Sequence, residues 1–509
     1  MTNSCFLLRR WRKKSLEYFK ELGIPGPEPS IIWGNLLEYH RNDRHDALNR
    51  WCDKYGDIFG FYNGDVPTLV VKDLNFLQYV FVSNFKNFVD RGITMRTDQV
   101  HSSLGKSLIH AKESQWRLLR SCTTLEFTSC KLKQLDCSRQ CAHFVNSLQV
   151  FENHSKSIRF VFVFDSVPPL LAGIRFGLKN YCPHAAKIHT RTKIPSFYEG
   201  SLKHLPTPLI SFSECTTTLG ILMKPLFWLN RMLGTFTMEM FVQEMKKIVR
   251  LRIQNSKTPR NDMLQNLLRA KVDPKHLFDG IPLKNLKSSE GKTPQDLRHL
   301  SEEEVVLLTT VLFIGGFQTT SVTLCFMSLL LAMHPEIQEK VRQEVKDTIE
   351  SSECLDYDTM THKLKYTSQV MNETLRLFPP SLTFHTRTAK DSFEYNGTTY
   401  KAGLCIMAPV LQIHRDPQYW PEPNKFDPER FSPENKGSYP KSAFQPFGVG
   451  PRCCVGYKLA LMQILYITAR IVQNFKMELG KAQKGSIQMR SSGMMAAPSD
   501  GPWIKFTRL

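Results

Sequence analysis

Several features that would assign this chain to a special class are missing from its sequence. No internal repeat and no Gly/Ser-rich linker divides the 509 residues cleanly. We therefore expect either two domains or one large domain built around a cofactor. The 13 cysteines lack the short, regular spacing of a disulfide scaffold or a zinc knuckle, and this predicts mostly free thiols in a reducing compartment.

A nucleic-acid-binding motif is also missing, although positive charge is in excess. The chain has 67 Lys and Arg residues against 47 Asp and Glu residues, and a net charge of +20. Without such a motif we expect no nucleic-acid partner. The charge instead favours an anionic membrane surface or an acidic protein partner.

The start of the chain lacks a long hydrophobic run. Residues 6–8 are apolar, but this stretch is too short for a signal peptide, and the basic run of residues 9–14 follows at once. Residues 22–29 are rich in proline and glycine, which excludes a helix or strand and predicts a rigid lead-in peptide. We expect a basic N-terminal segment over residues 1–21 and the body over residues 22–509.

Residues 305–333 form an uncharged run that is long enough to cross a bilayer. They are preceded by Ser301 and Glu304, whose spacing fits a capping box at the start of a helix. Several Thr, Ser and Gln residues lie within the run, which is a heavy polar load for a helix in lipid. We therefore predict a long helix buried in a soluble core rather than a membrane span.

The pattern of apolar residues predicts a mainly α protein with small β-sheets. Helical periodicity dominates residues 237–270 and 301–350. Alternation around Asn-Gly turn signals predicts two strands within residues 57–71 and a hairpin over residues 394–405. Residues 151–213 contain several prolines and have no sustained period, so we expect an atypical, loop-like segment there.

The most informative segment is the cysteine loop, residues 447–456, with the sequence Phe-Gly-Val-Gly-Pro-Arg-Cys-Cys-Val-Gly. Binding an iron ion through one thiolate requires a deprotonated sulfur, which backbone N–H groups and a nearby cation favour. Glycines let the backbone bend so that its N–H groups approach the sulfur. A helical stretch follows the loop and directs its positive N-terminal end toward the ligand. The loop thus has the parts of a thiolate site for iron.

This loop resembles the haem-binding loop of cytochromes P450, which has the pattern Phe-x-x-Gly-x-Arg-x-Cys-x-Gly. The resemblance implies the cytochrome P450 fold and haem b bound through a cysteine thiolate. Cys453 is a rival to Cys454, but the register of the motif selects Cys454 as the metal ligand. The other loop residues that match cofactor-binding positions are Phe447, Gly450, Arg452 and Gly456.

A second motif carries the same resemblance. Glu373 and Arg376 have Glu-x-x-Arg spacing on a predicted helix, and Arg430 lies in a Pro-Glu-Arg-Phe segment. In the family, residues in these positions form a buried triad that braces the cysteine loop. The resemblance therefore implies a structural role for the three residues rather than a catalytic one.

Three further residues match positions that contact the haem propionates in the family. Trp116 and Arg120 are four residues apart, which places them on one face of a predicted helix. Arg387 follows shortly after the helix-ending pair Pro379-Pro380. The resemblance implies that Trp116, Arg120 and Arg387 are cofactor-binding residues.

The long predicted helix matches the oxygen-activating segment of the family, with one departure. The family pattern is a small residue, Gly, any residue, an acid and Thr. Thr319 stands at the position of the hydroxyl that helps to deliver protons to oxygen. Gln318 stands at the position of the acid and cannot supply a titratable proton at neutral pH. We expect both residues to be catalytic, with altered proton delivery.

The resemblance implies a monooxygenase that inserts one oxygen atom from O2 into a lipophilic small molecule, such as a steroid, fatty acid or xenobiotic. Electrons are expected from NADPH through NADPH-cytochrome P450 reductase, with cytochrome b5 as a further partner. The chain resembles the microsomal drug- and steroid-oxidising branch that includes thromboxane synthase, which implies the cytosolic face of the endoplasmic reticulum membrane. That branch usually begins with an apolar anchor of about twenty residues. The sequence has no such run, and we expect residues 1–21 to be its remnant.

Two alternatives remain open. An isomerase or dehydratase of a lipid peroxide would keep the haem-thiolate but need no external O2; Gln318 favours it and Thr319 argues against it. A non-catalytic haem-binding relic would follow if residues 151–213 do not form the usual roof of the substrate pocket. Dependence of turnover on reductase and O2 separates the first alternative from a monooxygenase. Product formation from a broad substrate panel excludes the second.

Overall fold

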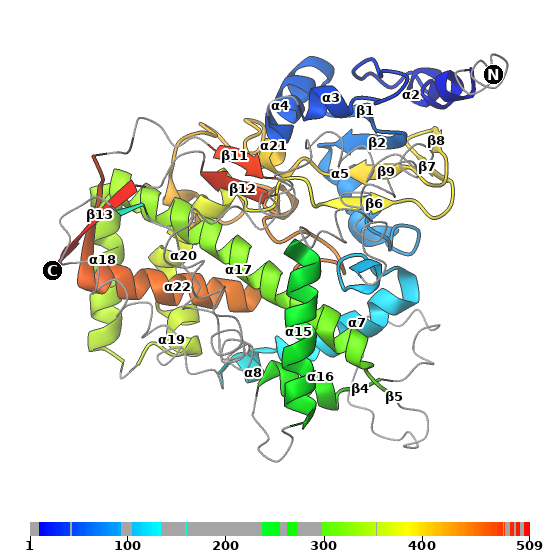
Figure 1. The fold of residues 1–509 in the computed structure, drawn as a ribbon. Helices are drawn as coiled ribbons and strands as arrows, with labels where there is room; N and C mark the ends of the chain where they lie inside the picture. Colours follow the sequence, from blue (N-terminus) through cyan, green and yellow to red (C-terminus); the bar gives the residue numbers. More distant parts are fainter. Residues whose placement is uncertain are drawn as a thin grey trace.

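The computed structural model describes residues 10–40, 43–92, 104–133, 158–159, 237–254, 262–272, 298–352, 354–481, 483, 489–492, 495–498 and 503–509. Residues 151–213, predicted to be atypical, lie outside this set except for strand β3 (Ile158–Arg159). Helices dominate the described residues, and the strands form five small sheets (Figure 1). The prediction of a mainly α fold with small β-sheets is confirmed.

The helical elements cluster around one long helix. The described α-helices are α2 (Tyr18–Glu21), α3 (Leu36–Tyr39), α4 (Arg44–Tyr55), α5 (Leu74–Gln78), α7 (Glu113–Glu126), α8 (Ser129–Lys133), α15 (Thr237–Gln254), α16 (Met263–Arg269), α17 (Glu302–Met333), α18 (Pro335–Glu350), α19 (Tyr357–His362), α20 (Lys365–Leu377), α21 (Val410–His414) and α22 (Tyr457–Asn474). Shorter turns of other helix types are η1 (Tyr79–Ser83), η2 (Leu104–Lys106), η10 (Pro428–Phe431) and η11 (Lys441–Ala443).

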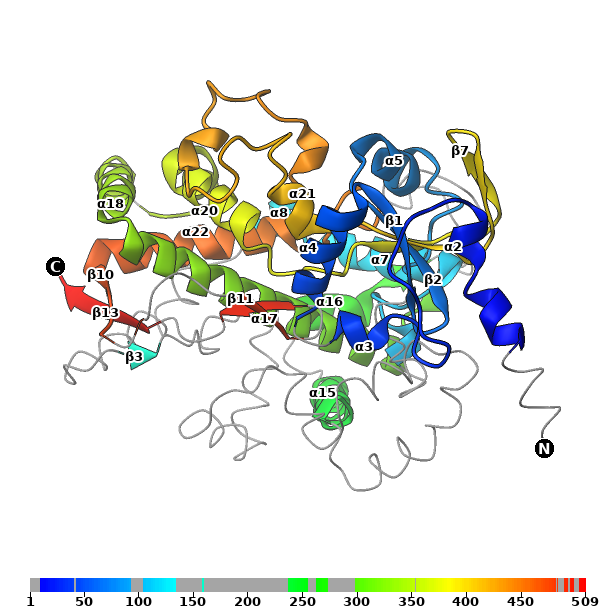
Figure 2. The same ribbon diagram turned by 90° about the horizontal axis from the view of Figure 1, so that it is seen from above.

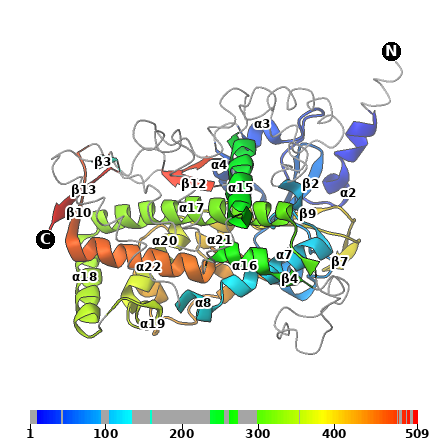
Figure 3. The same cartoon turned by 60° about the horizontal axis from the view of Figure 1, so that its bottom comes forward.

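Helix α17 runs through the middle of the molecule. It begins with the predicted capping box, in which Ser301 and Glu304 bond each other's backbone N–H groups. By length and composition α17 could cross a membrane, but α15, α20 and α22 pack against it. Figure 2 shows α22 running beside α17, with β10 at one end, and Figure 3 shows α15 crossing it. The prediction of a buried core helix is confirmed.

The two predicted helical regions are each divided into two helices. Residues 301–350 form α17 and α18, because Pro335 offers no N–H and His334 leaves helical geometry at φ −123° and ψ 77°. Residues 237–270 contain α15 and α16, and the Asp262 side chain caps the start of α16. Apolar periodicity located these regions correctly, but it did not show where each helix ends.

The main sheet has the strand order β1-β2-β9-β6, and its neighbours pair antiparallel, parallel and antiparallel. The predicted pair around Asn63-Gly64 is its first hairpin. The predicted hairpin over residues 394–405 is shorter than expected, because the chain turns at Gly403 (φ +82°) and Cys405 joins the main sheet. The remaining strand bounds are β1 (Ile58–Asn63), β2 (Val66–Val71), β4 (Lys271–Val272), β5 (Arg298–His299), β6 (Thr386–Thr388), β7 (Phe393–Tyr395), β8 (Thr398–Tyr400), β9 (Cys405–Met407), β10 (Phe475–Leu479), β11 (Met489–Ser492), β12 (Met495–Pro498) and β13 (Trp503–Arg508).

The second half of the basic N-terminal segment packs on the β1–β2 hairpin. Arg12 is buried and lies 3.4 Å from a carboxylate oxygen of Asp65. Phe19 is buried against Tyr62, with ring centroids 5.3 Å apart. Burial lowers the pKa of Arg12, and Asp65 opposes this shift. These contacts hold residues 12–21 against the main sheet.

The packing of α17 on α20 gives a direct test of this core. Phe326 is fully buried and stacks on Phe378, with ring centroids 4.3 Å apart. We expect Phe326→Ala to lower the free energy of unfolding by about 3–5 kcal/mol, because it leaves a cavity. Phe326→Leu, the control, should cost less than about 2 kcal/mol. Urea unfolding followed by circular dichroism measures both, and equal losses would contradict the packing described here.

Candidate active site

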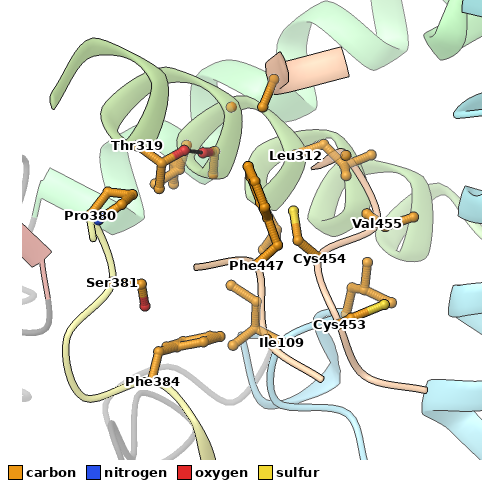
Figure 4. Close-up of a pocket in the computed structure, with 18 of the residues that line it drawn as sticks. Ile109, Leu312, Thr319, Pro380, Ser381, Phe384, Phe447, Cys453, Cys454 and Val455 are labelled. Atoms are coloured by element: carbon orange, nitrogen blue, oxygen red, sulfur yellow. Dashed lines mark hydrogen bonds between the residues drawn. The ribbon is translucent and has the colours of Figure 1, made fainter. Parts of the chain in front are cut away.

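A cavity of about 340 Å³ lies between α17, the cysteine loop and residues 380–387 (Figure 4). α7, α22 and residues 107–110 complete its wall. The sequence-predicted site residues that line it are Trp116, Arg120, Gln318, Thr319, Arg387, Phe447, Arg452, Cys454 and Gly456. Gly450 stands behind the wall, and Glu373, Arg376 and Arg430 lie outside it. Segments that are far apart in the sequence therefore meet around one hollow.

The cysteine loop is held by its own backbone. The Cys454 N–H donates to the Phe447 carbonyl oxygen at 2.8 Å, and the Cys453 N–H donates to the Gly450 carbonyl oxygen at 3.0 Å. Gly450 has φ +75°, and a Cβ atom there would overlap the Phe81 carbonyl. Glycine is thus required at this position both by the backbone conformation and by the close approach of η1.

The two neighbouring cysteines face different ways. Both cysteines line the cavity. Figure 4 shows the Cys454 sulfur directed toward α17, whereas the Cys453 sulfur points in another direction. Both thiols are free of disulfides. Arg120 Nη1 donates to the Cys453 carbonyl oxygen at 2.8 Å, and its Nη2 lies 3.9 Å from the Cys453 sulfur. Of the two sulfurs, that of Cys454 is the one placed to meet a ligand in the cavity.

Cys454 lies deep in the protein, and the cavity accounts for its accessible surface. Burial raises the pKa of the Cys454 thiol. The Gly456 N–H group and the Arg120 guanidinium oppose this shift, because both stabilise a thiolate. A positive ion bound at the sulfur would add to their effect.

Four arginines surround the cavity without matching carboxylates: Arg91, Arg120, Arg387 and Arg452. Among the described residues no Asp or Glu lines the cavity, and Asp90 reaches Arg452 only at 3.8 Å. The Nε atoms of Arg91, Arg387 and Arg452 are buried and have no hydrogen-bond partner. Burial and mutual repulsion lower the pKa of Arg91 to about 10 and that of Arg452 to about 9. A site with this imbalance needs an anionic ligand.

Within this arginine group, Arg452 packs on the ring of Trp116. The Arg452 guanidinium lies over the Trp116 ring, 4.5 Å from its centroid. Its Nη2 donates to the Ala111 carbonyl oxygen at 2.6 Å and its Nη1 to that of Ile109 at 3.3 Å. Arg452 is therefore fixed in place while its Nε remains unpaired.

Sequence reasoning missed Arg91 and His385, which also line the cavity. His385 stands two residues before Arg387, and such residues share one side of an extended chain. This spacing was a usable signal. Burial lowers the pKa of His385 to about 3, and its Nδ1 is buried without a partner. Arg91 had no comparable signal, because its Nη atoms bond the Phe384 and Arg452 carbonyls far along the chain.

The predicted triad residues come together where α20 meets η10. Arg376 donates two hydrogen bonds of 2.7 Å to the Glu373 carboxylate, and both side chains are fully buried. Arg430 Nε lies 3.5 Å from the same carboxylate. Burial raises the pKa of Glu373, and the two guanidiniums oppose this shift. Glu373 also accepts the Asp427 N–H at 3.0 Å, which ties α20 to the segment that leads to η10.

On α17, the wall of the cavity is open where the two glycines lie. A Cβ atom at Gly315 or Gly316 would meet no protein atom within 4 Å. The Thr319 hydroxyl donates to the Gly315 carbonyl oxygen at 2.5 Å, so its oxygen can still accept a hydrogen bond from the cavity. Gln318 lines the same wall. A flat group can therefore approach this face of the helix closely.

The family of this protein follows from its similarity to known sequences. The cytochrome P450 family model matches residues 24–504. The chain belongs to the cytochrome P450 family. Among its relatives are lithocholate 6-beta-hydroxylase of Mesocricetus auratus, 30% identical over 90% of this chain and 86% of the relative, and cytochrome P450 3A17 of Cavia porcellus, 30% identical over 93% and 89%. Cytochrome P450 3A6 of Oryctolagus cuniculus is 29% identical over 94% and 90%. The resemblance to the microsomal drug- and steroid-oxidising branch is thereby confirmed.

As a cytochrome P450 monooxygenase, the chain is expected to use haem-thiolate iron and O2, and its residues fit that group. The guanidinium groups that line the cavity could bind the haem carboxylates. The free Cys454 thiol could hold the iron. The open face at Gly315 and Gly316 would leave room for a flat macrocycle. The charge of the arginines, the free thiol and the open space beside α17 are therefore all compatible with a bound haem.

The close approach of Gly450 to η1 gives a test of the cysteine loop in this cytochrome P450. We expect Gly450→Ala to lower the haem content of the purified protein severely, because the Cβ atom would overlap the Phe81 carbonyl and force the loop to move. Gly403→Ala is the matched control, since Gly403 has φ +82° but open space around its Cα atom. Haem per chain is measured by pyridine haemochrome absorbance. Equal haem loss in both variants would contradict this account.

Proposed function

We propose that this cytochrome P450 holds haem b through the Cys454 sulfur and inserts one oxygen atom from O2 into a lipophilic small molecule. Electrons come from NADPH through a flavoprotein reductase. The bound haem-thiolate supplies the oxygen-activating chemistry, which the thiolate favours by donating electron density to the iron. The protein binds and orients the haem and the substrate, and its side chains hold the protons that the reaction uses.

The proposal rests on three kinds of group that line one cavity: a free thiol, a hydroxyl group on α17 and a group of arginines. The free sulfur of Cys454 faces α17, where Thr319 presents its hydroxyl oxygen (Figure 4). The arginine group supplies charge that the described residues do not neutralise. In this proposal Arg91, Arg120, Arg387 and Arg452, with Trp116 and His385, bind the carboxylates, while Phe447, Gly450 and Gly456 shape the loop around the sulfur.

The substrate is proposed to be a steroid-like, fatty or xenobiotic molecule. Apolar side chains line much of the cavity beside the polar groups of α17, and they include Leu312, Phe313, Phe317 and, from other segments, Ile109 and Phe384. Such a wall favours an apolar ligand held with few hydrogen bonds. The name of the hamster relative, a lithocholate hydroxylase, supports a steroid ring system as the first compound class to test.

The surface supports a membrane site and a redox partner. Near the N-terminus Trp11, Ile32 and Leu37 are 50%, 54% and 48% exposed, and Arg10, Lys13 and Lys14 are exposed as well. Apolar side chains with flanking cations suit an anionic bilayer surface. We infer attachment to the cytosolic face of the endoplasmic reticulum membrane. Lys458, in the first turn of α22 after the cysteine loop, donates to Ser129 of α8 at 2.9 Å, and α8 also carries the exposed Lys133, which pairs with Asp358. In this proposal the basic side chains of this region dock an acidic reductase or cytochrome b5.

One observation favours a second candidate function, a haem-thiolate rearrangement of a lipid peroxide. No carboxylate among the described residues lines the cavity, and Gln318 replaces the acid. Such a rearrangement needs neither reductase nor external O2. Turnover of a lipid hydroperoxide without NADPH, together with no turnover in the complete reductase system, would establish this function in place of the monooxygenase.

The proposed ligand has a direct spectroscopic test. In the reduced protein with carbon monoxide, we expect the strongly red-shifted Soret band of a thiolate-bound haem. Cys454→Ala should lose this band, because the cavity-facing sulfur is removed. Cys453→Ala is the matched control and should keep it, since the Cys453 sulfur does not point toward α17 and lies 3.9 Å from Arg120 Nη2. A band that survives in Cys454→Ala or disappears in Cys453→Ala would overturn the assignment.

The departure at Gln318 predicts the effect of restoring the acid. We expect Gln318→Glu to raise the product formed per NADPH consumed by about tenfold, because it supplies a titratable proton beside Thr319. Gln463→Glu places the same substitution on the α22 wall of the cavity and should not raise it. Product and NADPH are measured in the reconstituted reductase system. A Gln318→Glu variant with unchanged coupling would show that proton supply does not limit this enzyme.

A further inference from the structure

The imidazole of His414, at the end of α21, links α20 to the segment before the cysteine loop. The side chain is fully buried. Its Nδ1 lies 3.2 Å from the Arg376 carbonyl oxygen, and its Nε2 lies 2.9 Å from the Gln445 backbone nitrogen. Because the Gln445 N–H is a donor, Nε2 must accept, and the ring proton belongs on Nδ1. One neutral tautomer therefore satisfies both bonds.

Several contacts fix this ring in its orientation. Arg376 Nη1 donates to the His414 carbonyl oxygen at 2.8 Å, so the two residues bond each other in both directions. The imidazole stacks on Phe444, with centroids 5.5 Å apart and planes at 26°. Burial lowers the pKa of His414 to about 3, which keeps the ring neutral in ordinary buffers. The guanidinium that bonds His414 is the one that pairs with Glu373.

The other end of the link leads into the cysteine loop. Gln445 is buried, and its carbonyl oxygen accepts the Gly448 N–H at 3.0 Å. The Phe447 carbonyl oxygen, between these two residues, accepts the Cys454 N–H at 2.8 Å. The position of the Gln445 peptide thus helps to set where Cys454 lies. Without an acceptor for its N–H, this peptide would be buried and unsatisfied.

We propose that His414 is a positioning residue, which transmits the rigidity of the Glu373–Arg376 ion pair to Gln445 and so keeps the Cys454 thiolate on the haem iron. This role rests on the proposed function, since it presumes that Cys454 is the ligand. The hydrogen bond from the Gln445 N–H to His414 Nε2 is the contact that restrains the cysteine loop. Loss of this bond should let the loop move and the Cys454 sulfur become protonated, without removing the haem pocket itself.

Three variants separate the two ring nitrogens. His414→Gln places an amide oxygen near the position of Nε2, whereas His414→Asn reaches only the position of Nδ1. His414→Phe keeps a ring that can stack on Phe444 but removes both bonds. His45→Phe is the matched control, because His45 is a buried histidine of α4 that does not line the cavity.

The experiment follows the red-shifted carbon monoxide band of each reduced protein with time at 37 °C, together with haem content and the unfolding midpoint. We expect the band to convert to the thiol-type band about tenfold faster in His414→Phe and His414→Asn than in the parent. His414→Gln should stay within about threefold of the parent, as should His45→Phe. An unchanged unfolding midpoint would show that only the loop has loosened, whereas a lowered midpoint would show that the whole fold is weaker.

Each other outcome has a defined meaning. A parent that never shows the red-shifted band would overturn the proposed function, and the His414 role with it. A parent with the band and three His414 variants that convert at the parental rate would overturn the His414 role alone. Equal acceleration in all three variants, His414→Gln included, would also overturn it, because packing rather than the Nε2 acceptor would then be what matters.

Discussion

The constraint on which the rest of the site depends is the positive charge buried around the cavity. Four arginines line the cavity, three of their Nε atoms are unpaired, and no carboxylate of the described residues lines it. Such groups are costly to bury without an anion. A ligand with two carboxylates would balance this charge, and the free Cys454 sulfur and the open face of α17 line the same cavity.

The cysteine loop is positioned by contacts from three directions. Gly450 lets it pass against η1, its own N–H groups bond carbonyls within the loop, and Gln445 connects it through His414 to the Glu373–Arg376 pair. Gly450, Gln445, His414, Glu373 and Arg376 do not line the cavity. Together they fix the position of the Cys454 backbone, which the proposed role of its sulfur requires.

Much of this could be predicted from the sequence because the signals are local. The cysteine loop, the Glu-x-x-Arg pair and the Ser301 cap are each set by residues close together in the chain. Helix ends were less predictable, since Pro335 divides a region with continuous apolar periodicity. Arg91 and His414 could not be found, because their partners lie hundreds or tens of residues away and are backbone carbonyls or N–H groups, which leave no pattern in the sequence.

The measurement that tests the central claim most directly compares two ligands that differ in charge. Haem-free protein is titrated with haem and with haem dimethyl ester, whose carboxylates are masked, and binding is followed by Soret absorbance. If the arginine group exists to bind the carboxylates, haem should bind about 100-fold more tightly than the ester, and Arg387→Met should narrow the difference. Equal affinity for the two ligands would contradict the account.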